Sequence, residues 1–173
     1  ARRTRGSPTE NLYRAADKLV EMMDRRGIEI ALVVTVPSRR GAMSDYMLMR
    51  NAVSRHPKRL RHMAGGSRLK SMIQDIPANR VGKTDRTRFH KTANEILNAG
   101  AAGFGEMISY HLCMSRNHSY QFAPADHPLF KDLADIAAER NVAIDLHMEA
   151  VENPGPMPAN LKRACSKNPD HLE

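Results

Sequence analysis

Hydrophobic and polar positions follow two alternating patterns along the chain. Apolar residues recur at three- and four-residue intervals after Ser7-Pro8-Thr9-Glu10, which is the signature of a capped helix start. Gly27 supplies the left-handed stop of that helix. The run IEIALVVTV at residues 28–36 is continuously apolar and ends at Pro37. It predicts a strand covered on both faces, as in a parallel sheet.

The same alternation repeats three more times. Helices are predicted over residues 44–55, 87–98 and 126–141, strands over residues 59–64, 102–107 and 142–147, and a last short helix over residues 160–167. Each strand start is about one β-α unit after the previous one, although the sequence itself does not repeat at that period. The order indicates an α/β fold with parallel strands and right-handed crossovers.

Four strands in this order fit either a doubly wound sheet or half of a (β/α) barrel. A doubly wound nucleotide-binding protein should carry a glycine-rich phosphate turn after its first strand. Residues 35–44 read TVPSRRGAMS instead, and Gly65-Gly66 after the second strand lacks the remaining phosphate-binding pattern. The sequence therefore disfavours classical nucleotide binding.

Composition limits the other classes of function. A length of 173 residues predicts one domain, and no apolar run approaches the roughly 18 to 20 residues of a membrane span. The net charge of +8 raises the question of nucleic acid, but the main basic cluster, RHPKRLRH at residues 55–62, is not interleaved with aromatic residues. A basic nucleic-acid-binding α/β module stays an alternative of low weight. Cys113 and Cys165 show no metal-ligand spacing and leave the cellular compartment open.

The strand ends hold the residues that could carry chemistry, because function in parallel α/β folds gathers at the carboxyl ends of the strands. Glu106 follows a glycine-flanked apolar strand, and a buried carboxylate there needs an ion pair or a bound cation. His147 ends the next strand, on the face that Asp145 also occupies. Neighbouring strands would bring Glu106 and His147 to one rim as divalent-metal ligands. A hydrogen-bonded structural histidine is the alternative for His147.

Two long loops follow these strands, over residues 109–125 and 149–159. Loops at this rim usually face the substrate. His111 could add a ligand or a proton-transfer group, and Glu149 begins the second loop as another substrate-facing candidate.

Three segments resemble the metal-dependent hydrolases of the amidohydrolase superfamily, in the branch that groups hydrolases with related decarboxylases. They are GFGEM at residues 103–107, PADHPLFKDL at 124–133 and ADIAAERNVAIDLHMEA at 134–150. LVEMMDRRGIEIALVV, at residues 19–34, resembles the first helix and second strand of that family.

The resemblance implies a TIM-type (β/α)8 barrel with one or two divalent metals, zinc or alternatively manganese, and a small-molecule substrate. Glu106 would match the ligand on the fourth strand, and His147 the histidine of the fifth. The HxH pair of the first strand, the histidine of the sixth and the aspartate of the eighth have no counterpart in residues 1–173. We therefore expect one incomplete barrel domain, holding about strands two to five with their helices.

The implied activity is metal-dependent hydrolysis of an amide, ester or lactone, with a decarboxylase on the same scaffold as the alternative. An incomplete barrel would leave sheet edges unpaired and part of its interior face uncovered. We therefore expect the 173-residue chain to be marginally stable and to self-associate, and a homo-oligomer is left open.

Overall fold

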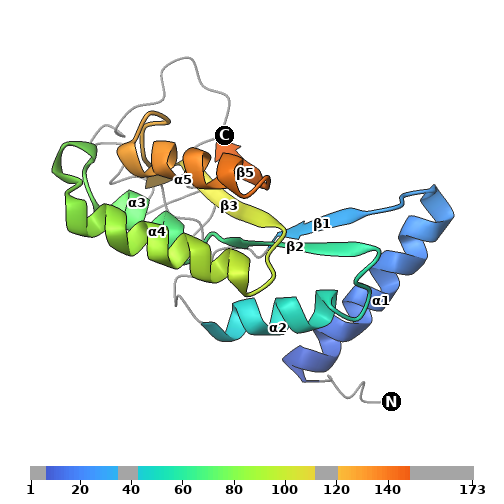
Figure 1. Ribbon diagram of the computed structural model, residues 1–173. Helices are drawn as coiled ribbons and strands as arrows, with labels where there is room; N and C mark the ends of the chain where they lie inside the picture. The colour runs from blue at the N-terminus through green and yellow to red at the C-terminus, as the bar shows by residue number, and fades with distance from the viewer. Residues whose placement is uncertain (1–6, 35–42, 112–120, 149–173) are drawn as a thin grey trace, which may run out of the picture.

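The computed structural model describes residues 7–34, 43–111 and 121–148, and these form an α/β fold (Figure 1). In chain order the elements are α1 (Pro8–Arg26), β1 (Ala31–Val34), α2 (Met43–Val53), β2 (Leu60–Gly65), α3 (Leu69–Asp75), the 3-10 helix η1 (Ala78–Arg80), α4 (Lys83–Asn98), β3 (Gly103–His111), β4 (Gln121–Phe122), α5 (Pro128–Glu139) and β5 (Ala143–Met148). The predicted helix over residues 160–167 lies outside the described residues.

The first helix begins and ends where the sequence predicts. The Ser7 hydroxyl accepts a hydrogen bond from the Glu10 amide, and the Ser7 amide donates to the Glu10 carboxylate at 2.6 Å. This reciprocal pair satisfies two amide groups that have no partner inside the helix. Gly27 closes the helix with a φ of 65°, a conformation that glycine adopts without a steric penalty.

Four strands form a parallel sheet in their order along the chain. β1 pairs with β2, β2 with β3, and β3 with β5, all in parallel. The predicted parallel arrangement of the four strands is therefore confirmed. β4 adds an antiparallel partner at the end of β3, which makes the sheet mixed. No sequence pattern indicated β4, because a strand of two residues is too short to show an alternating pattern.

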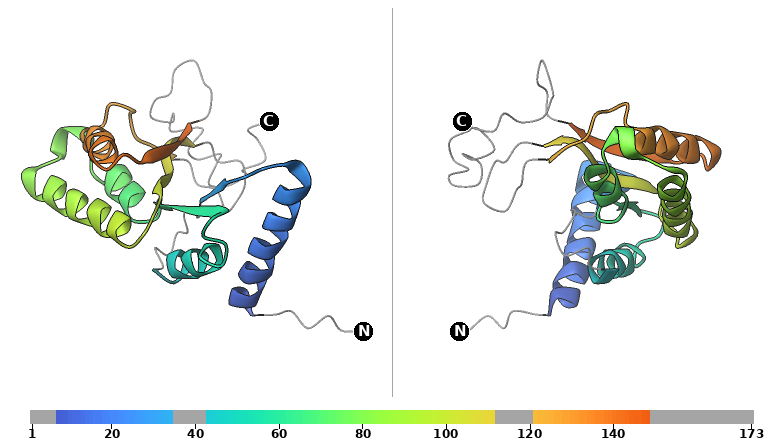
Figure 2. Two further views of the ribbon diagram at one scale, coloured as in Figure 1. Left: turned by 45° about the vertical axis from the view of Figure 1, so that its right-hand side comes forward. Right: turned by 90° about the vertical axis from the view of Figure 1, so that its left-hand side faces the viewer.

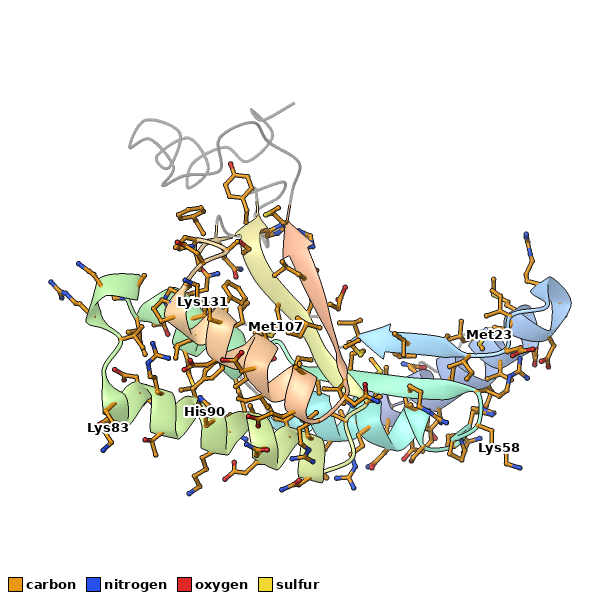
Figure 3. All side chains as sticks on the ribbon, turned by 45° about the horizontal axis from the view of Figure 1, so that its top comes forward. Met23, Lys58, Lys83, His90, Met107 and Lys131 are labelled. Atoms are coloured by element: carbon orange, nitrogen blue, oxygen red, sulfur yellow. The ribbon has the colours of Figure 1, made fainter. Side chains whose placement is uncertain are left out.

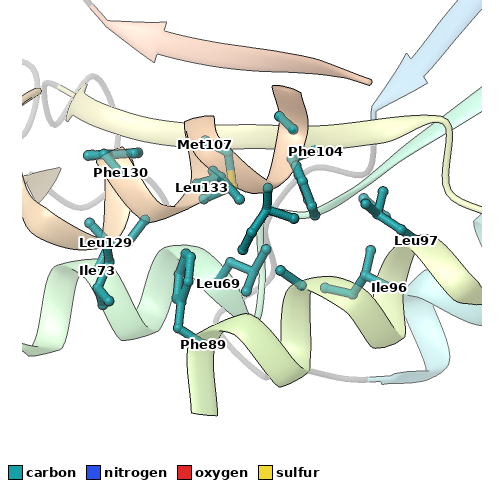
Figure 4. Packing of buried hydrophobic residues seen from close by; sticks show 14 of the residues in the cluster. Leu69, Ile73, Phe89, Ile96, Leu97, Phe104, Met107, Leu129, Phe130 and Leu133 are labelled. Atoms are coloured by element: carbon teal, nitrogen blue, oxygen red, sulfur yellow. The ribbon is translucent and has the colours of Figure 1, made fainter. Parts of the chain in front are cut away.

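All the described helices lie on one face of the sheet, as the two turned views and the side-chain view show (Figures 2 and 3). The strands contribute Leu60, Ala64, Phe104 and Met107 to the buried residues beneath that face. Around Leu60, α1 and α2 complete a smaller cluster, while α3, α4 and α5 enclose the larger one, which contains Phe89, Leu129 and Leu133 (Figure 4). Within the described residues, the one-sided coverage and the sequential strand order differ from a complete doubly wound sheet, which reverses its order and carries helices on both faces.

The opposite face of the sheet carries small side chains where β2, β3 and β5 meet. Met63 lies over Gly103, and a Cβ at Gly105 would approach the Cβ of Asp145 to 3.0 Å. On β1, Leu32 points to this face and is 57% exposed. No helix in the described part of the chain covers this face (Figure 3).

Two predictions about the elements were wrong. The sequence patterns predicted no regular element over residues 69–75, but these residues form α3. The third strand was expected to stop at Met107, but β3 continues to His111, because Met107, Ile108 and Tyr110 go on pairing with β5. Glu106 therefore lies within the strand rather than at its end.

Candidate metal and acid-base site

A bulge in β3 determines the position of Glu106. Phe104 pairs with Ile144 and Met107 pairs with Leu146, so three steps along β3 match two steps along β5. In a regular strand Glu106 would share the helix-covered face with Phe104, since side chains alternate. The extra residue keeps both Phe104 and Met107 in the core, as Figure 4 shows, and sends Glu106 to the other face.

Glu106 and His147 are in direct contact. The His147 Nδ1 atom lies 2.7 Å from the Glu106 Oε1 atom, and the two side chains are 33% and 24% exposed, respectively. His147 pairs with Ile108 in the register of β3 and β5. The predicted proximity of these two side chains is confirmed. At this distance the carboxylate accepts a hydrogen bond from the Nδ1–H group, which orients the ring.

His111 extends this cluster along β3. Its ring meets the ring of His147 edge to face, with the centroids 4.9 Å apart. His111 was expected in the loop after the strand, but it is the last residue of β3 and pairs with Gln121 of β4. Glu149, the other substrate-facing candidate, lies outside the described residues.

The start of α3 is attached to β3 beside this cluster. The Gly66 amide donates to the Gly105 carbonyl at 3.2 Å, and a Cβ at Gly66 would lie 2.6 Å from the Glu106 carbonyl oxygen. Near the end of α3, the Gln74 side-chain amide donates to the Ile108 carbonyl at 2.7 Å. The helix therefore fixes the backbone of β3 on both sides of Glu106.

Lys70 belongs to the site although the sequence analysis did not single it out. It lies in the first turn of α3, half-buried, and burial lowers the pKa of its ammonium group, while the carboxylates of Glu106 and Asp75 act in the opposite direction. The sequence held a signal for α3, because Leu69, Met72, Ile73 and Ile76 recur at helical spacing. Recognising that helix would have shown that Lys70 follows the end of β2.

The donors in this cluster suit a divalent cation only in part. A carboxylate and an imidazole are ligands that zinc and manganese accept. Glu106 and His147 could hold such an ion if it replaced the proton between them. Within residues 7–34, 43–111 and 121–148, no group of three or more histidine, cysteine or acidic side chains has a geometry that could hold a metal. A complete site would therefore need a further donor from the rest of the chain or from another chain.

Other charged and polar residues have structural roles. Arg55 donates to both carboxylate oxygens of Asp17, and His56 contacts the same carboxylate at 2.7 Å. Arg59 donates to the carbonyl groups of Ile28 and Glu29, and so fixes the segment that leads into β1. Two arginines of the basic cluster at residues 55–62 thus have intramolecular partners, which leaves less of its charge for phosphates.

A buried histidine and a buried carboxylate hold α5 in place. His127 caps α5 by accepting from the Leu129 amide, and its Nε2–H donates to the Ile76 carbonyl at 2.9 Å. Asp132 of α5 forms ion pairs with Arg86 and His90 of α4. His127, His90 and Asp132 contribute to the packing of helices and lie outside the Glu106–His147 cluster.

Comparisons with protein-family models, with curated protein sequences and with solved structures found no match to this chain. Across the described residues, every helix is too short or too polar to pass through a lipid bilayer.

Proposed function

We propose that this chain carries part of the active site of a metal-dependent hydrolase, built on a partial TIM-type barrel. The contact between Glu106 and His147 is the observation on which the proposal depends. It joins two ligand-type side chains from neighbouring parallel strands, on the face that the described helices leave uncovered.

The fold supports this proposal in two respects. Strands in sequential order with all helices on one face are the arrangement of a (β/α)8 barrel before closure. The uncovered face would then be the barrel interior, and the carboxyl ends of β3 and β5 would lie at the rim where barrel enzymes carry their active sites.

In the proposed reaction Glu106 and His147 would hold the divalent ion, zinc or manganese. When bound, such an ion lowers the pKa of coordinated water and polarises a carbonyl oxygen. In the absence of the ion, Glu106 orients the His147 ring through its Nδ1 atom at 2.7 Å. The favoured substrates are amides, esters or lactones; a decarboxylation on the same scaffold would use the same ligands, and no observation favours it.

The experiment measures zinc and manganese binding by the full chain, by calorimetry and by metal analysis after dialysis. We expect wild-type protein to bind one of these ions, and Glu106→Ala or His147→Ala to weaken binding by at least about tenfold, because each substitution removes a ligand. His90→Ala and Glu139→Ala are the matched controls, since both residues are exposed and lie on helices. Wild-type affinity in Glu106→Ala protein, or no uptake by wild-type protein, would contradict the proposal.

Hydrolysis is tested separately with a panel of amides, esters and lactones, each with and without added metal. Activity that appears only with the ion, and is lost in His147→Ala but kept in His90→Ala, supports the hydrolase. Salt-sensitive binding of DNA by metal-free protein, with no metal uptake, would instead favour the nucleic-acid alternative.

A further inference from the structure

The position of Lys70 follows from the contacts that α3 and the loop before it make with β3. Lys70 and Gln74 are one turn apart in α3, so they share one side of that helix. Gln74 reaches the Ile108 carbonyl of β3, and Gly66, four residues before Lys70, bonds to the Gly105 carbonyl. Lys70 therefore lies between Gly66 and Gln74, whose hydrogen bonds to β3 are made on either side of Glu106.

The charge of Lys70 is only loosely compensated. The carboxylates of Glu106 and Asp75 attract the Lys70 ammonium electrostatically. Among the residues that the structure describes, however, no acidic side chain forms an ion pair with Lys70 within 4.0 Å. Glu106 is engaged with His147 instead. A half-buried ammonium group has lost part of its hydration, and an anionic partner would restore the lost interaction energy.

We propose that the Lys70 ammonium binds a carboxylate group of the substrate and thereby positions the substrate over Glu106 and His147. That this carboxylate belongs to a substrate rests on the proposed function. A carboxylate fits better than a phosphate, because the ammonium of Lys70 is a single compact charge and the neighbouring Glu106 adds a negative one. The substrate class is therefore an amide, ester or lactone that carries a free carboxylate.

The binding step is tested in the full chain without metal, with acetate as the probe and acetamide as its uncharged counterpart. Lysine labelled with carbon-13 at Cε reports on each ammonium group by NMR, and Lys70→Arg protein assigns the signal of Lys70. At fixed pH we expect acetate to shift the Lys70 signal saturably, while acetamide leaves it unchanged. The signal of Lys91, an exposed residue of α4, is the internal control. A Lys70 signal that acetate does not move, or that acetamide moves equally, would overturn the proposal.

A second measurement separates this proposal from the hydrolase itself. Pairs of substrates that differ only in a free carboxylate are compared in wild-type, Lys70→Gln and Lys91→Gln protein. We expect Lys70→Gln to raise KM roughly tenfold or more for the carboxylate substrate alone, with little change in kcat. Metal-dependent hydrolysis with no preference for the carboxylate would overturn the role of Lys70 and leave the hydrolase standing. Acetate binding at Lys70 without metal uptake would overturn the metal-dependent hydrolase and leave anion binding by Lys70 standing.

Discussion

Gly66 lies against the peptide group of Glu106 so closely that any side chain at position 66 would collide with it. A Cβ there would be 2.6 Å from the Glu106 carbonyl oxygen and 2.8 Å from its amide nitrogen. Both are backbone atoms and cannot rotate away. The loop before α3 and the bulge of β3 therefore determine together where the Glu106 carboxylate lies.

We expect Gly66→Ala to displace the Glu106 backbone and to lower the free energy of unfolding by about 1 to 3 kcal/mol, the usual cost of overpacking. It should also weaken metal binding, because the carboxylate moves away from His147. Chemical denaturation and calorimetry measure the two effects. Gly82→Ser is the control, since a Cβ at Gly82 meets only the Asp85 carboxylate at 3.6 Å. Equal effects of the two substitutions would show that the packing at Gly66 is not specific.

The sequence predicted the regular elements well, because their signals are local. The Ser7-to-Glu10 cap, the left-handed Gly27 and the four parallel strands each follow from residues next to one another in the chain. The proximity of Glu106 and His147 followed from the tendency of sequential strands to pair.

The details of the site were not predictable in the same way. If side chains alternated regularly along β3, Glu106 would share the core-facing side of Phe104. Only the pairing with β5 shows the extra residue that turns Glu106 to the opposite face. The role of α3 also depends on a tertiary contact, because the hydrogen bond from Gln74 to the Ile108 carbonyl joins segments far apart in the chain. Lys70 was missed because α3 was missed, although its apolar spacing was visible.

His62 should make the protein sensitive to acid. It is buried in β2, and burial, with a smaller effect from Arg50, lowers the pKa of its imidazole from the ordinary value of 6.5 to about 4. The unfolded chain therefore binds a proton more readily than the folded one between these two values. Stability should be greatest above pH 6.5 and should fall as the pH drops towards 4, by about 3 kcal/mol from this residue.

Urea denaturation of wild-type and His62→Leu protein between pH 4 and pH 7.5 measures this effect. The two stabilities are compared as a function of pH, so that the other titrating groups cancel. We expect the pH dependence to be shallower in His62→Leu protein than in the wild-type protein. Parallel curves for His62→Leu and wild-type protein would contradict the assignment.

The edge strand β1 should promote self-association. Ile30 and Leu32 are 52% and 57% exposed and occupy alternate positions, so they extend to one side beside a strand edge with which no described strand pairs. We expect sedimentation velocity to show concentration-dependent association of the wild-type chain, which Leu32→Glu should reduce. Met22→Glu is a matched control, because Met22 is 51% exposed on α1 and the charge change is identical. Equal effects of the two substitutions, or a strictly monomeric wild-type chain, would count against a role for β1.

The positive charge of Lys70 should oppose a cation at Glu106 and His147. The Lys70 ammonium acts electrostatically on Glu106, and it would therefore repel a cation bound at Glu106 and His147. Screening by solvent reduces this for a half-buried group, so we expect Lys70→Met to tighten zinc binding about tenfold. Lys70→Arg keeps the charge and should bind zinc like the wild-type chain, and Lys91→Met controls for the loss of a distant charge. Calorimetry under one set of conditions compares the four proteins. If Lys70→Met and Lys70→Arg bind zinc equally, the ammonium group does not act on the ion, and Lys70 then lies too far from Glu106 to place a substrate over it.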